Sequence, residues 1–182
     1  AKRLNFGLGY PVFDFNYPLP YCLAEIFHLA GFPLVDSVKF LFALAYIVSG
    51  LTMFWWLKTR VTMLPAFMGA IFYLYAPYRF VDLYVRGALG EHLSFVFLPL
   101  CFLGIDKIFQ NEKIKWMAFL AINFALLILS HNIMAMMFSA ILMAYLLGKT
   151  IVRKSWRLGK LGILGILGGL MLTAYFWVPA LY

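Results

Sequence analysis

A short charged run between two apolar segments holds the side chains best suited to chemistry in this chain. The run is "YAPYRFVDLYVRGALGEH", residues 75–92, and its ionisable residues are Arg79, Asp82, Arg86, Glu91 and His92. Only 12% of the chain is charged, so this concentration is unusual. Arginine binds oxyanions through a planar fork of N–H donors, and a positioned carboxylate accepts a proton from a hydroxyl group. The run therefore predicts a site that holds a lipid phosphate or pyrophosphate head group.

The spacing of three of these residues predicts one shared helix face. Arg79, Asp82 and Arg86 follow the pattern i, i+3, i+7, so Asp82 can pair structurally with either arginine. We expect Gly87 and Gly90 to end this helix, which leaves the last two ionisable residues at the membrane edge. The alternative is a salt-bridge cluster that only fixes the loop, because exposed ion pairs are common and weak.

The rest of the composition is that of a membrane protein. Hydrophobic residues make up 65% of the 182 residues, and the mean hydropathy is +0.91. Several apolar runs approach the ~20 residues that a bilayer crossing needs. The net charge of +8 does not indicate nucleic acid binding, because the basic residues cluster at the ends of the apolar runs. We therefore predict an all-α, polytopic transmembrane helical bundle.

Six spans are expected from the apolar pattern. The longest run, 115–149, would be roughly 50 Å long as one helix, too long for a hydrocarbon core of ~30 Å. It is therefore split at its polar cluster "SHN", with the turn at His131 and Asn132. The expected spans are 38–57, 62–77, 93–109, 116–130, 133–149 and 161–178.

The orientation follows from the basic residues. Ten of the 15 lysines and arginines fall in three short loops on one side: Lys58, Arg60, Lys107, Lys113, Lys115, Lys149, Arg153, Lys154, Arg157 and Lys160. The positive-inside rule makes this side cytoplasmic. Segment 1–37, the charged run and the SHN turn then lie outside. Five of the seven acids share that side: Asp14, Glu25, Asp36, Asp82 and Glu91.

Segment 1–37 is expected to be part of an outer loop, and 38–182 a single membrane domain. Aromatic residues and prolines in 9–21 predict an ordered, non-helical loop. A short helix over 21–31, stopped by Gly31, would lie in the membrane interface or serve as an aromatic anchor. Because the chain begins at Ala1 and ends as a span finishes, we expect a piece of a longer protein whose remainder is a partner of this fragment.

Two other motifs have a structural and a functional interpretation. His131 and Asn132 are either polar turn residues or ligands of the same phosphate as Glu91 and His92. The histidines form no recognisable zinc motif, so no metal ligand is assigned, although a divalent metal is possible. The glycines of the last span, including Gly165 and Gly169, indicate close helix packing rather than a nucleotide loop.

Several motifs together carry a family resemblance. "GYPVFDFNYPLPY", "LYAPYRFVDLYVRGALGEH", "LSHN" and "AYFWVPALY" occur in this order and span nearly the whole chain. They resemble the bacterial and archaeal membrane family labelled "6-pyruvoyl-tetrahydropterin synthase-related". The architecture of that family is similar to the GT-C class of integral membrane glycosyltransferases, which use polyprenyl-phosphate sugar donors and an acidic residue in the first outer loop.

The resemblance implies roles for the polar residues. Arg79 and Arg86 would bind the donor phosphate, assisted by His92, His131 and Asn132. Asp14 or Glu91 would activate the acceptor hydroxyl, with an acid upstream of Ala1 as the better candidate. The implied location is the cytoplasmic membrane of a bacterium or archaeon, with the polar site on its outer face.

Two other functions remain open. A transporter or flippase of lipid-linked sugars would use the same arginines to recognise the head group, and a non-catalytic membrane scaffold would need none of them. A transporter is expected to carry ionisable groups near the centre of the membrane, whereas the expected spans here are free of charge at their centres. The sequence therefore favours an enzyme that works at the membrane surface.

Overall fold

Helices are the only regular elements in residues 16–179, the part of the chain that the computed structural model describes. This confirms the predicted all-α class. In chain order they are α2 (Leu19–Leu29), α3 (Leu34–Leu57), α4 (Met63–Leu74), α5 (Pro77–Phe80), the π-helix η1 (Val81–Arg86), α6 (Leu89–Asn111), α7 (Ile114–Ser130), α8 (Asn132–Arg153), α9 (Trp156–Leu172) and α10 (Ala174–Trp177).

Three of these helices are long and apolar enough to cross a membrane by themselves. They are α3, α6 and α8, with 24, 23 and 22 residues. A helix stands at each of the six expected spans, but α4 has only 12 residues and α7 and α9 have 17 each. Since a straight crossing needs ~20 residues, length and composition support three of the six expected spans within residues 16–179.

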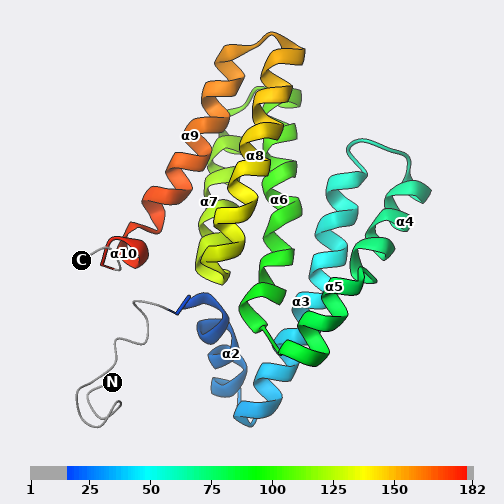
Figure 1. Cartoon of the computed structure of the whole chain (residues 1–182), viewed down its shortest axis with the longest axis vertical. Helices are drawn as coiled ribbons and strands as arrows, with labels where there is room; N and C mark the ends of the chain where they lie inside the picture. Colours follow the sequence, from blue (N-terminus) through cyan, green and yellow to red (C-terminus); the bar gives the residue numbers. More distant parts are fainter. Residues whose placement is uncertain (1–15, 180–182) are drawn as a thin grey trace.

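The central helix of the bundle is α6. In Figure 1 it lies between α3 and α4 on one side and α7, α8 and α9 on the other. Most of the α6 side chains are buried, whereas only a minority of those on α3 and α8 are. The main core joins α6 and α7 through Cys101, Ile105, Ile108, Leu120 and Leu127, none of which is accessible to solvent. Side chains near the start of α6 are therefore held on the most enclosed helix of the fold.

Helix α9 packs closely on α7 through its glycines. A Cβ atom at Gly165 would lie 3.1 Å from the carbonyl oxygen of Met117, and one at Gly169 would lie 2.8 Å from that of Ala121. A side chain at either position would push the two helices apart. The packing role predicted for these glycines is therefore confirmed.

The start of α6 differs from the expectation. The predicted span began at residue 93, but the helix begins at Leu89, so Glu91 and His92 lie in its first turn rather than in a loop. Gly87 does end the preceding helix, with a left-handed φ of +59°. Gly90 was predicted to break a helix and instead lies inside α6. Its lack of a side chain allows the carbonyl group of Ser130 to approach, since a Cβ there would lie 2.5 Å from that oxygen.

The links at the other end of the bundle are shorter than predicted. The charged stretches 106–115 and 149–160 were expected to be loops, but α6 continues to Asn111, α8 continues to Arg153 and α9 begins at Trp156. Each turn has only two residues between helices, and Glu112 and Lys154 adopt left-handed φ values of +53° and +51°. Ile105, Ile108 and Phe109 keep the helical spacing of apolar residues, so α6 continues past the first charged residues, Asp106 and Lys107.

The remaining boundaries differ by a few residues. Helix α2 begins two residues before the predicted 21–31, and Gly31 (φ +99°) follows its end as expected. Helix α3 begins four residues before the predicted 38. The second expected span ends at Leu74, and Pro77 begins α5, because proline also suits the first turn of a helix. Asp14 and most of the predicted loop 9–21 lie outside the described residues.

The topology separates two ends of the bundle. Figure 1 shows the turns after α6 and α8 at its upper end, with the α3–α4 turn also directed upward. These three turns carry the basic loops, and we call this the basic end. The start of α6 and the α7–α8 turn lie at the opposite end, which we call the polar end. The charged run and the SHN turn are thus brought together, as the alternation of spans predicted.

Candidate functional site

The charged run folds back on itself at the polar end. Helix α5 and η1 carry its first half, and α6 carries Glu91 in its second half. The left-handed residue Gly87 reverses the chain between them. Tyr78, Asp82 and Arg86 therefore face Glu91 across this turn. We call these four residues the carboxylate cluster.

Arg86 and Tyr78 together hold Glu91. The Nη1 atom of Arg86 lies 2.7 Å from Oε2 of Glu91 and donates a hydrogen bond of 2.9 Å to the Tyr78 hydroxyl oxygen. The Tyr78 hydroxyl in turn donates to Oε1 of Glu91. The side chain of Glu91 is 5% exposed and that of Arg86 is 46% exposed. A buried carboxylate thus lies directly behind a guanidinium that still faces solvent, and such charge-assisted contacts are stronger than neutral ones.

Asp82 lies behind this pair and has no exposed surface. Burial, followed by the charge of Glu91, raises the pKa of Asp82 to about 7. Its Oδ1 atom is 3.7 Å from Nη1 of Arg86, and its Oδ2 atom is 3.8 Å from Nδ1 of His92. Of the two arginines, Arg86 is the one close enough to pair with Asp82 when Asp82 is ionised, so the cluster holds a proton-labile carboxylate near neutral pH.

Arg79 does not share the exposed face of Arg86, contrary to the helical spacing. Its side chain is only 2% exposed, and its guanidinium lies over three aromatic rings. The ring centroids of Tyr46, Tyr73 and Phe95 are 5.1, 5.2 and 4.7 Å from its Cζ atom. The wider turn of η1 changes the register between the two arginines, and these cation–π contacts draw Arg79 inward.

The guanidinium of Arg79 is also without a hydrogen-bond partner among the described residues. The same holds for both ring nitrogens of His92, which is fully buried. The His92 ring lies 5.4 Å from that of Phe42 and is stacked at 6.1 Å on that of Tyr46. Both residues were predicted to bind a head group, and the structure sets them behind the surface that such a group would reach.

His131 and Asn132 stabilise the start of α8. The Nδ1 atom of His131 accepts a hydrogen bond of 3.2 Å from the Met134 amide, as a helix N-cap does. The Oδ1 atom of Asn132 accepts one of 2.9 Å from the Ile133 amide. Burial lowers the pKa of His131, and the charge of Glu91 opposes this shift. His131 is thus within electrostatic range of the carboxylate cluster while it serves as a cap.

The sequence did not point to a second polar centre, at the basic end. Asp106 was given no role from the sequence, but it lies in α6 with no exposed surface. Arg60 binds it through two hydrogen bonds of 2.7 Å, from Nε to Oδ2 and from Nη2 to Oδ1. The other donors are Trp56 at 2.9 Å, Tyr145 at 2.6 Å and Lys149 at 2.6 Å. The apolar period around residue 106 was the signal that could have identified it as buried.

The two centres have different chemical capacities. Every Asp106 oxygen is occupied by several donors, so this residue ties α3, α6 and α8 together and is not free to react. In the charged run, the charges of Arg79 and Arg86 balance those of Asp82 and Glu91 when both carboxylates are ionised. In this run, Arg86 combines a solvent-facing cation with an adjacent buried carboxylate. No group of three or more histidine, cysteine or acidic residues suited to a metal occurs within residues 16–179.

Comparison with known proteins gives one result. The model of a membrane protein family described as "6-pyruvoyl-tetrahydropterin synthase related domain" matches residues 13–182. No curated protein and no solved structure matches the chain significantly. The match covers the charged run, the SHN turn and all the described helices.

Proposed function

We propose that this chain, which belongs to the 6-pyruvoyl-tetrahydropterin synthase-related family of membrane proteins, transfers a sugar from a polyprenyl-phosphate donor. The observation that carries the proposal is the contact of 2.7 Å between the solvent-facing Arg86 and the buried Glu91. The pair offers an oxyanion binder and a proton acceptor side by side, at the end of the bundle opposite the basic loops.

Each residue of the pair has one role in the proposed reaction. Arg86 binds the donor phosphate and stabilises its negative charge as the bond between the anomeric carbon and the phosphate oxygen breaks. The acceptor hydroxyl oxygen forms the new bond to the anomeric carbon. Glu91 takes the hydroxyl proton, and polyprenyl phosphate leaves.

The buried residues position this pair. Tyr78 and Arg86 both contact Glu91, so its carboxylate keeps a single orientation. Arg79 and His92 lie behind the cluster and do not reach the phosphate in this proposal. Both act on Asp82: Nδ1 of His92 lies 3.8 Å from its Oδ2 atom, and the charge of Arg79 favours its ionised form.

The side of the membrane follows from the basic loops. Ten of the 15 basic residues lie at or next to the turns of the basic end. The positive-inside rule assigns that end to the cytoplasm. The carboxylate cluster would then work at the outer face of a bacterial or archaeal cell membrane, where it would receive its lipid-linked donor.

One observation favours a second function, translocation of a lipid-linked sugar. A buried carboxylate whose pKa lies near 7 can bind and release a proton during transport, as in proton-coupled carriers. In that case Arg86 would hold the head group, and no sugar would be transferred.

Sugar transfer in vesicles tests the proposal. The full-length protein would be reconstituted with a radiolabelled polyprenyl-phosphate sugar and extracts that contain acceptors. Replacing Glu91 with Gln is expected to lower transfer by roughly 100-fold or more, as the loss of a general base does. Arg86→Gln should lower both donor binding and transfer. Glu25→Gln and Arg153→Gln are matched controls outside the cluster.

Three outcomes separate the functions. Transfer that depends on Arg86 and Glu91 supports the glycosyltransferase. Head-group binding or translocation without transfer favours the transporter and overturns the enzyme. If the wild-type protein neither binds nor transfers such a donor, both proposed functions are wrong.

A further inference from the structure

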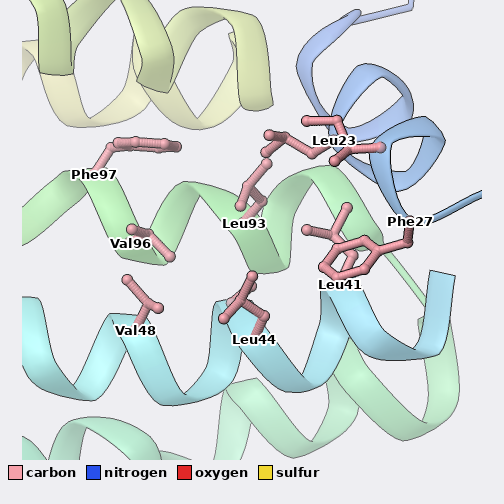
Figure 2. A pocket seen from close by; sticks show the side chains of 10 residues that line it. Leu23, Phe27, Leu41, Leu44, Val48, Leu93, Val96 and Phe97 are labelled. Atoms are coloured by element: carbon pink, nitrogen blue, oxygen red, sulfur yellow. The ribbon is translucent and has the colours of Figure 1, made fainter. Parts of the chain in front are cut away.

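An apolar cavity of about 320 Å³ lies between α2, α3 and α6. Figure 2 shows its walls, with Leu23 and Phe27 on α2, Leu41 and Val48 on α3, and Leu93 on α6 directed into the same space. Every residue on the wall is apolar. The volume lies at the lower end of the range for ligand sites, enough for part of one chain. The cavity therefore suits a hydrocarbon group.

The mouth of this cavity lies on an exposed apolar surface. Leu44 on α3 and Ile26 on α2 line the cavity and are 47% and 61% exposed. The same face of α3 continues two turns further along at Leu51, which is also exposed. Helix α3 is one of the three candidate spans. The cavity is therefore continuous with a surface that bilayer chains contact.

A second cavity, of about 300 Å³, lies between α2, α3 and the start of α6, toward the polar end. Its walls include Tyr17, Tyr21 and residues 87–90. Along α3 it is bordered by Val38 and Phe42, outward of Val48 in the apolar cavity. The wall between α2, α3 and α6 thus carries two tyrosines in its outer part and is entirely apolar further in, so its polarity decreases from the polar end inward, as that of a lipid does.

We propose that an acyl chain of a membrane phospholipid occupies the apolar cavity, with its head group toward the polar end. An empty cavity facing lipid would lose dispersion contacts on every wall, and a chain from the bilayer restores them. Water would find no hydrogen-bond partners on these walls, and a charged group would remain unpaired there.

This site is distinct from the proposed reaction site. Successive residues on a helix are rotated by about 100°, so neighbours in the sequence face different directions. Glu91 faces Tyr78 and Arg86, whereas Leu93 and Val96 face α2 and α3. The two sites lie on different faces of α6, so either proposal can fail without the other.

Photo-crosslinking tests the proposed lipid site. The full-length protein would be reconstituted in phosphatidylethanolamine vesicles that contain a fraction of the same lipid with a diazirine on one acyl chain. After irradiation, peptides containing Leu23–Phe27, Leu41–Val48 or Leu93–Phe97 are expected to carry the lipid mass. Leu44→Trp would block the mouth, and Leu51→Trp places the same side chain on the same helix face outside the cavity.

The expected result is a roughly tenfold loss of label at these peptides in Leu44→Trp, the change that losing about 1.4 kcal/mol of contacts produces. The Leu51→Trp variant should keep the wild-type label. Thermal unfolding of both variants establishes that they are folded. Because Leu44 is half exposed, we expect both to fold. Should Leu44→Trp nevertheless fail to fold, competition by unlabelled lipid on the wild-type protein decides the outcome.

Three results would overturn the proposal. The first is that the three peptides are labelled equally in Leu44→Trp and in Leu51→Trp. Another is label that maps only to other helices. The third is displacement of the label by unlabelled polyprenyl phosphate but not by unlabelled phosphatidylethanolamine, which would assign the cavity to a different lipid.

Discussion

Arg86 and Glu91 form an ion pair of 2.7 Å across the left-handed turn at Gly87. Arg86 is the last residue of η1, and Glu91 lies in the first turn of α6. The contact therefore closes the charged run into a compact unit and brings Tyr78 and Asp82 to the same place.

Removing one partner of the ion pair is expected to cost more stability than removing both. Arg86→Gln leaves the buried Glu91 carboxylate without its cation and should lower the unfolding temperature in detergent. In the double variant with Glu91→Gln, no charge remains unpaired, so part of the loss should be recovered. Circular dichroism melts of the three variants and the wild type measure this. Strictly additive losses would contradict the pairing.

Stability is expected to fall as pH rises toward neutrality because of Asp82. In the native state Asp82 keeps its proton up to about pH 7, whereas in the unfolded chain it releases it near its ordinary value of 3.8. The native state thus binds more protons between these values, and the free energy of unfolding decreases with pH in this window and levels off above it. Asp82→Asn should remove this part of the pH dependence in urea or thermal unfolding between pH 4.5 and 8. A profile unchanged by the substitution would show that Asp82 titrates normally.

Asp106 should contribute far more to stability than an exposed acid. Asp106→Asn leaves Arg60 and Lys149 without their shared carboxylate, and breaking a buried ion pair costs about 3–5 kcal/mol. Asp36→Asn is the matched control, because Asp36 pairs with Lys39 at 3.5 Å on an exposed surface, where such pairs contribute at most about 1 kcal/mol. Chemical denaturation of both variants in the same detergent compares them. Equal losses would refute the central role of Asp106.

Two glycine-to-alanine substitutions are expected to act in opposite directions. At Gly90 a Cβ would lie 2.5 Å from the Ser130 carbonyl oxygen, so Gly90→Ala should force α6 away from the α7–α8 turn and destabilise the protein. At Gly148, inside α8, a Cβ would meet no atom within 4 Å. Gly148→Ala should therefore stabilise by up to about 1 kcal/mol through helix propensity. Unfolding temperatures in detergent give the sign of each effect.

Substitutions at His131 can separate its capping role from a role in phosphate binding. His131→Ala removes the acceptor for the Met134 amide and should cost about 1 kcal/mol, whereas His131→Asn keeps a good N-cap. If His131 only caps α8, the Asn variant should match the wild type in both stability and binding of a polyprenyl phosphate. Normal stability with weakened binding would instead assign His131 to the phosphate site.

The apolar pattern was sufficient to predict the helices but not all of their ends. The division of the long apolar run at His131 was correct, because no single helix of that length fits a bilayer core. Charges in 106–115 and 149–160 were taken as loop signals, yet α6 and α8 continue into them. A helix can continue past charged residues when one of its faces is still packed against a neighbour. In α6 the buried side chains of Ile105 and Ile108 form that face.

The helical class, the membrane character and the residues of the charged run all follow from the amino-acid sequence, since each depends on local composition and period. The use of these residues depends on how the helices pack. Arg79 and Arg86 have the same side chain seven positions apart, yet aromatic rings from α3, α4 and α6 enclose the first, and the second remains at the surface beside Glu91. Burial and pairing depend on side chains from distant parts of the chain, which no local pattern records.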